Sequence, residues 1–211
     1  YTSKNFSFKS PFDLIIYFHG NNGRPSHHLK AAKKILGGNN TNAIMLAVDP
    51  INGGKARSQP KYWSSVPGNM VEMFLKDVAS ITGESYSNLY ANARLHLYGW
   101  SGGGGAVSIY ANKMPANDVA KTVHIQFNDG IYNTRTGKGS WKGNVSKIIE
   151  KFGASKVALM SGKDKSTTRP MVALKKKQPE VYHFKSKKGH HWFKTKINLN
   201  KLAGSEGAPP T

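Results

Sequence analysis

The stretch Arg94-Leu95-His96-Leu97-Tyr98-Gly99-Trp100-Ser101-Gly102-Gly103-Gly104-Gly105-Ala106-Val107 decides the fold of this 211-residue chain. It begins as an apolar run typical of a buried strand and passes through Gly-x-Ser-x-Gly into a segment of helical character. A serine in such a turn is held in a strained backbone conformation, with its hydroxyl raised above the carboxyl end of the sheet. The stretch therefore predicts a nucleophilic serine, Ser101, with the Gly102 N–H beside its hydroxyl.

Two phosphate-binding motifs that share glycines with this stretch do not fit it. A P-loop would end in Gly-Lys-Ser or Gly-Lys-Thr, and neither is present. A dinucleotide fingerprint would require glycine or alanine where Val107 stands. A glycine turn between strand and helix, with no catalytic role, remains the alternative at this point.

The rest of the chain alternates apolar, strand-like runs with helical patterns, which favours a mainly parallel sheet with helices on both faces. We expect strands at residues 13–18, 43–48, 94–98, 122–127, 157–160 and 181–184, and helices at 25–35, 69–81, 106–113, 145–152 and 170–177. The length and the 38% apolar content suit one domain. The prediction is a three-layer α/β domain over residues 1–203, followed by a loose polar tail at 204–211.

The residues that follow the predicted strands come in an order that resembles that of the α/β-hydrolase superfamily. His19-Gly20 follows the first strand, Ser101 a central one, Asp164 a later one and His190-His191 the last. The likeness covers nearly the whole chain and implies a Ser-Asp-His order of catalytic residues. Residues 128–152 are too few for a large helical lid, so we expect a minimal form of the fold with an open site suited to a polymer or surface-borne substrate.

The resemblance also implies the roles of the catalytic residues. Ser101 requires a base, because a free serine hydroxyl is almost fully protonated at neutral pH. His190 is favoured as that base, with His191 as the alternative. Asp164 is favoured as the acid that orients the base, and Asp129, which ends the preceding strand, is its rival. Each aspartate also fits an ordinary surface turn.

An oxyanion hole needs two N–H donors near the nucleophile. Gly102 supplies the first, and the resemblance places the second at Asn21 or Gly20, although residues 20–23 also read as a plain polar turn. His19 is expected to be structural. Candidate substrate contacts are three aromatic residues: Trp63, Trp100 and Tyr132.

The formal net charge is +20, and residues 151–211 hold fourteen basic side chains against three acidic ones. This excess favours a polyanionic partner such as a cell-wall polymer, a lipid surface or nucleic acid. A solvated lysine surface that only aids solubility is the alternative. The absence of cysteine excludes a cysteine nucleophile and a thiolate metal site, and no His-Glu-x-x-His motif is present. We therefore expect no metal and no cofactor.

These observations favour a serine hydrolase that cleaves an ester, or less readily an amide, in or near a polyanionic polymer or surface. The competing hypothesis is a binding module on a hydrolase scaffold, with its lysine-rich face on nucleic acid or another anionic polymer. No apolar run is long enough to cross a membrane. We expect a monomer, exported to the periplasm or the exterior, because the chain starts without methionine and is strongly basic.

Overall fold

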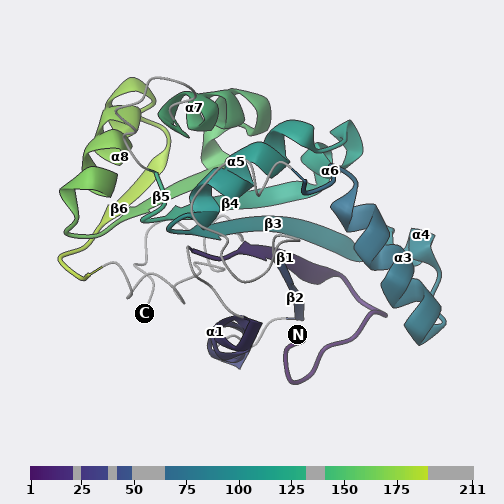
Figure 1. Ribbon diagram of the computed structural model, residues 1–211. Helices are drawn as coiled ribbons and strands as arrows, with labels where there is room; N and C mark the ends of the chain where they lie inside the picture. The colour runs from purple at the N-terminus through teal and green to yellow at the C-terminus, as the bar shows by residue number, and fades with distance from the viewer. Residues whose placement is uncertain (21–24, 38–41, 49–64, 132–140, 190–211) are drawn as a thin grey trace.

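The computed structural model describes residues 1–20, 25–37, 42–48, 65–131 and 141–189 (Figure 1). Within these residues six strands form one fully parallel sheet in the order β2-β1-β3-β4-β5-β6. The strands are β1 Phe12–Phe18, β2 Ala43–Val48, β3 Ala93–Trp100, β4 Thr122–Asn128, β5 Val157–Ser161 and β6 Tyr182–Lys185. The expected α/β class and parallel sheet are confirmed.

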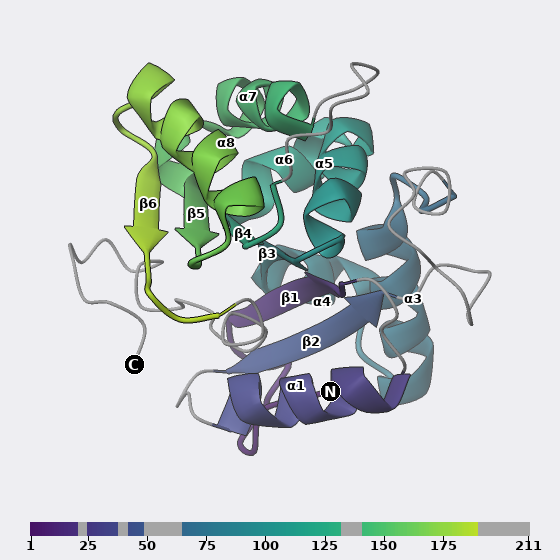
Figure 2. The ribbon, with the colours of Figure 1, turned by 60° about the vertical axis from the view of Figure 1, so that its left-hand side comes forward.

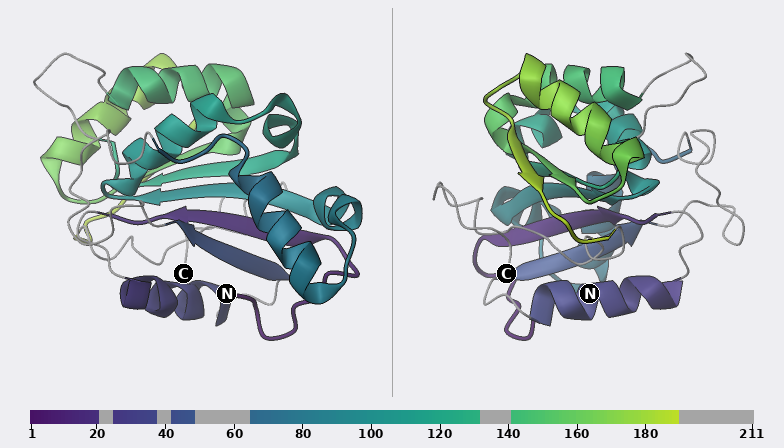
Figure 3. Two further views of the ribbon diagram at one scale, coloured as in Figure 1. Left: turned by 45° about the vertical axis from the view of Figure 1, so that its right-hand side comes forward. Right: turned by 90° about the vertical axis from the view of Figure 1, so that its left-hand side faces the viewer.

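The connections between strands explain why the helices divide unequally between the two faces (Figure 3). A parallel crossover is almost always right-handed, so its direction along the sheet fixes the face that its helix covers. The chain moves one way from β1 to β2 and the opposite way from β2 onward. Helix α1 Pro25–Gly37 therefore lies on one face, the α1 face. The other face, the α5 face, carries α3 Met70–Thr82, α4 Tyr86–Asn92, α5 Gly103–Lys113, α6 Ala116–Lys121, α7 Trp141–Phe152 and α8 Lys165–Lys177.

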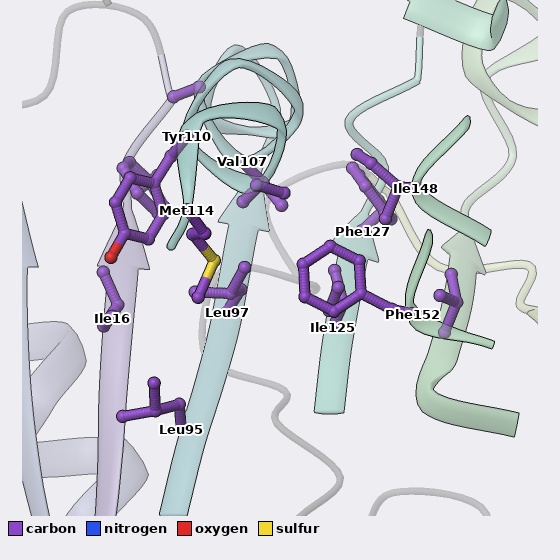
Figure 4. Close-up of a cluster of buried hydrophobic side chains, with 14 of the residues drawn as sticks. Ile16, Leu95, Leu97, Val107, Tyr110, Met114, Ile125, Phe127, Ile148 and Phe152 are labelled. Carbon is purple, nitrogen blue, oxygen red and sulfur yellow. The ribbon is translucent and has the colours of Figure 1, made fainter. Parts of the chain in front are cut away.

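The main hydrophobic core lies between the sheet and the helices of the α5 face (Figure 4). All seven residues of β1 are buried, as expected for an interior parallel strand covered on both sides. Alternate strand residues such as Leu97 and Phe127 point toward α5 and α7, where Val107 and Ile148 meet them. This packing fixes the register of the strands, because a one-residue slip would turn their apolar side chains to the opposite face.

Two helix starts differ from the sequence-based expectation. Helix α5 begins at Gly103 rather than at Ala106. Glycine is a poor helix former, so the sequence did not predict helix at residues 103–105. The close approach of the Phe18 carbonyl leaves room only for glycine at position 103. Helix α8 begins at Lys165 rather than Pro170, because the Asp164 side chain accepts a 2.8 Å hydrogen bond from the Ser166 N–H and caps the helix. The short helices α4 and α6 were not expected, since six or seven residues give too little periodicity to detect.

A small polar cluster joins β1 to β3 at the amino ends of the strands. Asp13 is 3% exposed and accepts hydrogen bonds from His96 Nε2 at 2.8 Å and Arg94 Nη2 at 2.9 Å. Burial raises the pKa of Asp13, but the hydrogen bonds and charges of His96 and Arg94 outweigh it and hold the pKa below its ordinary value. The cluster is far along the strands from Ser101, so we expect it to contribute stability rather than chemistry.

Replacing Asp13 by alanine is expected to lower the free energy of unfolding at pH 7 by about 2–3 kcal/mol, because the buried His96 ring loses the acceptor of its Nε2. Chemical denaturation measures this, with the exposed Asp77→Ala as control, expected to change stability by less than about 0.5 kcal/mol. Since the folded-state pKa of Asp13 is depressed, its contribution is present above the unfolded pKa near 3.8 and is lost as pH falls below it. Equal stability of the two variants at pH 7 would contradict this role.

Candidate active site

The site is built where the strand order reverses. Strand β1 leads to β2 on one side and lies beside β3 on the other, so the connections after β1 and β3 leave on opposite faces. In open parallel sheets a crevice forms outside the carboxyl ends of such a strand pair and commonly binds the ligand. Here these ends carry His19-Gly20 after β1 and Ser101-Gly102 after β3.

Ser101 has the backbone conformation expected of a nucleophile elbow. Its φ is +53°, in the left-handed region, and among the described non-glycine residues only Asp129 shares a positive φ. The Ser101 N–H donates to the Asn128 carbonyl at 3.0 Å, and the Ser101 carbonyl accepts from the Gly104 N–H at 3.0 Å. Hydrogen bonds to β4 and to the first turn of α5 thus hold a conformation that an L-residue rarely adopts.

Glycines around Ser101 allow the strand, the turn and the helix to approach closely. A Cβ at position 103 would overlap the carbonyl of Phe18 in β1, and one at position 104 would overlap the carbonyl of Gly130. A Cβ at Gly99 would lie 2.7 Å from the Gly103 carbonyl oxygen. The close contacts of α5 with β1 and with Gly130 after β4 therefore require these glycines. A simple glycine turn between a strand and a helix would not require such close contacts.

The backbone after β1 lies directly against the nucleophile. A Cβ on Gly20 would be 2.9 Å from Ser101 Cβ and 2.8 Å from the ring of Trp100. The neighbouring His19 is 3% exposed, and its Nδ1 is hydrogen-bonded to the Gly20 carbonyl. Donation to this carbonyl requires the proton on Nδ1. The contact fits the structural role expected for His19.

Trp100 is 8% exposed and packs in a second hydrophobic cluster between the sheet and α1. Its ring lies under the Gly20 backbone and so supports the loop that follows β1. The contacts of Trp100 are those of a packing residue, and its expected role in substrate binding stays a prediction.

The two candidate acids have different surroundings. Asp129 is fully buried, has a φ of +47°, and its Oδ1 accepts from Thr167 Oγ1 and from the Gly162 N–H at 3.4 Å. It thereby joins the end of β4 to the loop after β5 and to α8. Asp164 is exposed and caps α8 through the Ser166 N–H. Asp129 Oδ1 is thus bonded to internal donors, whereas Asp164 lies at the surface of the same sheet edge.

The segment after β6 returns to the loop that carries Asp164. The Lys163 N–H donates to the Lys188 carbonyl at 3.2 Å, and Gly189 lies beside the Lys163 side chain. These contacts place the last described residues, immediately before His190 in the sequence, next to the residue immediately before Asp164. Asn21, Trp63, Tyr132, His190 and His191 themselves lie outside the described residues.

Comparisons with known proteins add the fold family. No family model and no curated protein matches the chain. Similar solved structures include a lipase-esterase related protein from Clostridium acetobutylicum, with TM-score 0.50 and 15% identity over 97% of this chain and 96% of that one. A hormone-sensitive lipase from a metagenome library has TM-score 0.52 and 11% identity over 96% and 75%. The chain has the α/β-hydrolase fold.

An uncharacterised protein from Bacillus cereus is also similar, with TM-score 0.54 and 13% identity. The similarity covers 92% of this chain but only 59% of that protein. At these identities the likeness establishes the α/β-hydrolase fold of the chain and leaves its activity to the residues of the site.

Within this α/β-hydrolase fold, the structure shows a polar pair that was not predicted from the sequence. Ser161, at the end of β5, is hydrogen-bonded to His183 Nε2 of β6 at 2.8 Å. Burial lowers the pKa of His183, and the charges of Lys175 and Lys185 lower it further, which favours the neutral imidazole. Both residues sit within strand-like runs, and only the pairing of β5 with β6 brings them together.

A second unexpected feature is a buried polar row on the α1 face of β4. His124, Gln126 and Asn128 alternate along the strand, with 3.2 Å between His124 Nε2 and Gln126 Oε1 and 2.6 Å between Gln126 Nε2 and Asn128 Oδ1. The row ends at Asn128 Nδ2, which is hydrogen-bonded to the Tyr98 hydroxyl. Because the Asn128 carbonyl also binds the Ser101 N–H, the row ties the elbow to the interior of the sheet.

Among the described residues, no group of three or more histidines, aspartates or glutamates is arranged to hold a metal ion. No helix in the described ranges combines the length and apolar character that crossing a membrane requires.

Proposed function

We propose that this chain is a serine hydrolase that cleaves carboxylic esters through an acyl-enzyme formed on Ser101. The observation that carries the proposal is the left-handed conformation of Ser101 at the end of β3, with the Gly20 backbone in contact beside it. A strained φ at a non-glycine residue costs free energy and persists where the surrounding structure enforces it, which happens most often at functional sites. The similarity to a lipase-esterase related protein and to a hormone-sensitive lipase favours an ester over an amide.

In the proposed reaction, the Ser101 hydroxyl attacks the ester carbonyl carbon while a histidine takes its proton. The histidine then protonates the departing alkoxide, which leaves as the alcohol, and Ser101 keeps the acyl group. A water molecule, deprotonated by the same histidine, releases the acid and restores the serine. We assign the base to His190, which follows Gly189 and the loop contact with Lys163, and keep His191 as the alternative.

We propose Asp164 as the acid that orients this base. Its support is the 3.2 Å hydrogen bond between the Lys163 N–H and the Lys188 carbonyl, since Asp164 directly follows Lys163 and only Gly189 stands between Lys188 and His190. Asp129, the rival, already accepts from Thr167 and Gly162, which gives it a structural task. A carboxylate at this position would fix the histidine tautomer and stabilise the imidazolium that forms.

The oxyanion is proposed to bind at the N–H of Gly102 and at that of Asn21 or Gly20. The start of α5 at Gly103 adds the positive end of the helix dipole at the same place. His19 holds the carbonyl of Gly20, and the same peptide unit carries the N–H of Asn21. Because C=O and N–H of a trans peptide point in opposite directions, we propose that His19 positions this donor.

Covalent labelling by a fluorophosphonate tests the proposed chemistry directly. The reagent reacts with serines activated by a neighbouring base, so we expect one equivalent of label on Ser101, located by peptide mass spectrometry. The Ser101→Ala variant should take up none, and wild-type protein denatured before exposure should also remain unlabelled. A folded wild-type protein that stays unlabelled, or a label on another serine, would contradict the proposal.

A further inference from the structure

A cationic groove runs along the exposed side of α8 at the β6 edge of the sheet. Its volume is about 630 Å³, within the range of ligand-binding clefts. Figure 2 shows α8 beside β5 and β6, whose arrows point the same way. Six basic side chains line the groove: Lys163, Lys165, Arg169, Lys176, Lys185 and Lys187.

The basic residues come from two walls of the groove. Lys165, Arg169 and Lys176 are spaced at helical intervals and form one stripe along α8, while Thr167, Met171 and Leu174 face the core. Lys185 and Lys187 stand on the opposite wall, at the end of β6. From Lys165 to Lys176 the stripe extends about 16 Å at the usual rise per helical residue.

The basic side chains of the groove outnumber the acids near them in the sequence. Within the described ranges none of the six forms an ion pair with a carboxylate. Asp164, between Lys163 and Lys165, caps α8, and no acidic residue stands between Asp164 and Glu180. Cations gathered around one cleft repel each other, and a bound anion relieves this repulsion. Lysines that only aid solubility would be expected to spread over the surface, whereas these basic residues lie on two walls of one groove.

We propose that this groove binds a linear polyanion, a chain that carries phosphate or carboxylate groups at regular intervals. The extended stripe and the opposing lysines suit several anionic groups in a row better than one isolated ion. A single nucleic-acid strand is disfavoured because none of the described residues that line the groove is aromatic, and stacking on aromatic side chains is what such strands commonly use. Val172 and Ala173 of α8 add apolar surface to the lining beside the charged side chains.

The position of the groove connects it to the candidate active site. Gly162 and Lys163 at one end of it belong to the carboxyl edge of the sheet, the edge at which Ser101 also lies. A bound polymer would therefore run toward the site and present esters attached to it. This last step rests on the proposed hydrolase function, whereas binding in the groove does not.

Binding of fluorescently labelled inorganic polyphosphate to the full chain tests the groove. The test variant is Arg169→Ala/Lys176→Ala/Lys185→Ala, and the control is Lys30→Ala/Lys33→Ala/Lys34→Ala, which removes three exposed charges from α1 on the opposite face. We expect about tenfold weaker binding for the test variant and a salt-dependence slope smaller by about two, with little change in the control. The Ser101→Ala variant should bind as wild type does, which separates this proposal from the hydrolase proposal.

Three outcomes would overturn the groove proposal. Equal losses in the two triple variants would show a diffuse positive field rather than a site. Tighter binding of oligo-dT than of polyphosphate of equal charge would identify nucleic acid as the ligand. Equal affinity for orthophosphate and polyphosphate would show that the groove recognises single ions and not a chain. Tighter binding of polyglutamate or polyphosphate than of these competitors would support the proposal, and the preferred polymer would identify its anionic group.

Discussion

Replacing Ser101 by alanine is expected to lower kcat for ester hydrolysis by about 10⁶-fold, the loss seen when a triad serine is removed. The covalent route disappears with the hydroxyl, while the binding groups around it remain. KM should change little, because the substrate is held by other residues. Initial rates on a panel of p-nitrophenyl esters of increasing acyl length measure both constants and also define the acyl preference of the site.

Ser108→Ala is the matched control for this prediction. Ser108 is buried on α5, two turns after the elbow, and its hydroxyl donates to the Gly104 carbonyl at 3.1 Å. The same chemical change there should leave kcat close to the wild-type value. Circular dichroism and thermal unfolding of both variants establish that each is folded. Retention of more than about one hundredth of the activity by Ser101→Ala would rule out the acyl-enzyme on this residue.

Replacing Asp164 by asparagine is expected to lower kcat by about 10⁴-fold, because asparagine stabilises the wrong tautomer of the base and not its protonated form. Asparagine is as good a helix N-cap as aspartate, so the hydrogen bond to the Ser166 N–H and the stability of α8 should be preserved. A loss of activity without a loss of stability is therefore the specific signature. Steady-state kinetics and chemical denaturation measured on the same preparation test it.

Asp129→Asn is the comparison that decides between the two acids. Its side chain bonds Thr167 and the Gly162 N–H, and the change should cost about 1–2 kcal/mol of stability, as expected for weakened hydrogen bonds to a buried charged group. Its kcat should fall less than about tenfold, as expected for a residue without a direct part in proton transfer. A 10⁴-fold loss in Asp129→Asn with near-normal activity of Asp164→Asn would transfer the role to Asp129.

Most of the fold was predictable from the sequence because the strands are buried on both faces. The largely apolar runs at residues 13–18 and 43–48 are found as β1 and β2, and β1 is longer by one residue at its start. The starts of α5 and α8 were misplaced for a common reason: tertiary contacts overrode local preference. Gly103 begins a helix because the Phe18 carbonyl leaves no room for a side chain, and the cap by Asp164 allows α8 to begin before Pro170 and include it.

The candidate site was predictable in part. Ser101 was found from the Gly-x-Ser-x-Gly spacing, because the sharp turn requires glycines at fixed offsets. The contact of Gly20 with Ser101 requires knowledge of which strands are neighbours, and so do the Ser161–His183 pair and the buried row that ends at Asn128. No local pattern carries that information, since the partners lie on different strands or look like ordinary strand residues.

The sequence by itself determined the elbow, the alternation of strands and helices, and the excess of positive charge, because each depends on residue type and short spacing. The tertiary structure alone decided which strand ends meet and on which face each helix lies. It also divided two similar aspartates, placing Asp129 among internal donors and Asp164 at the exposed start of α8. The tertiary structure also gathered part of the positive charge into one groove. Lysines from α8 and β6 are separated in sequence, and only the packing of that helix on the sheet edge brings them to one cleft.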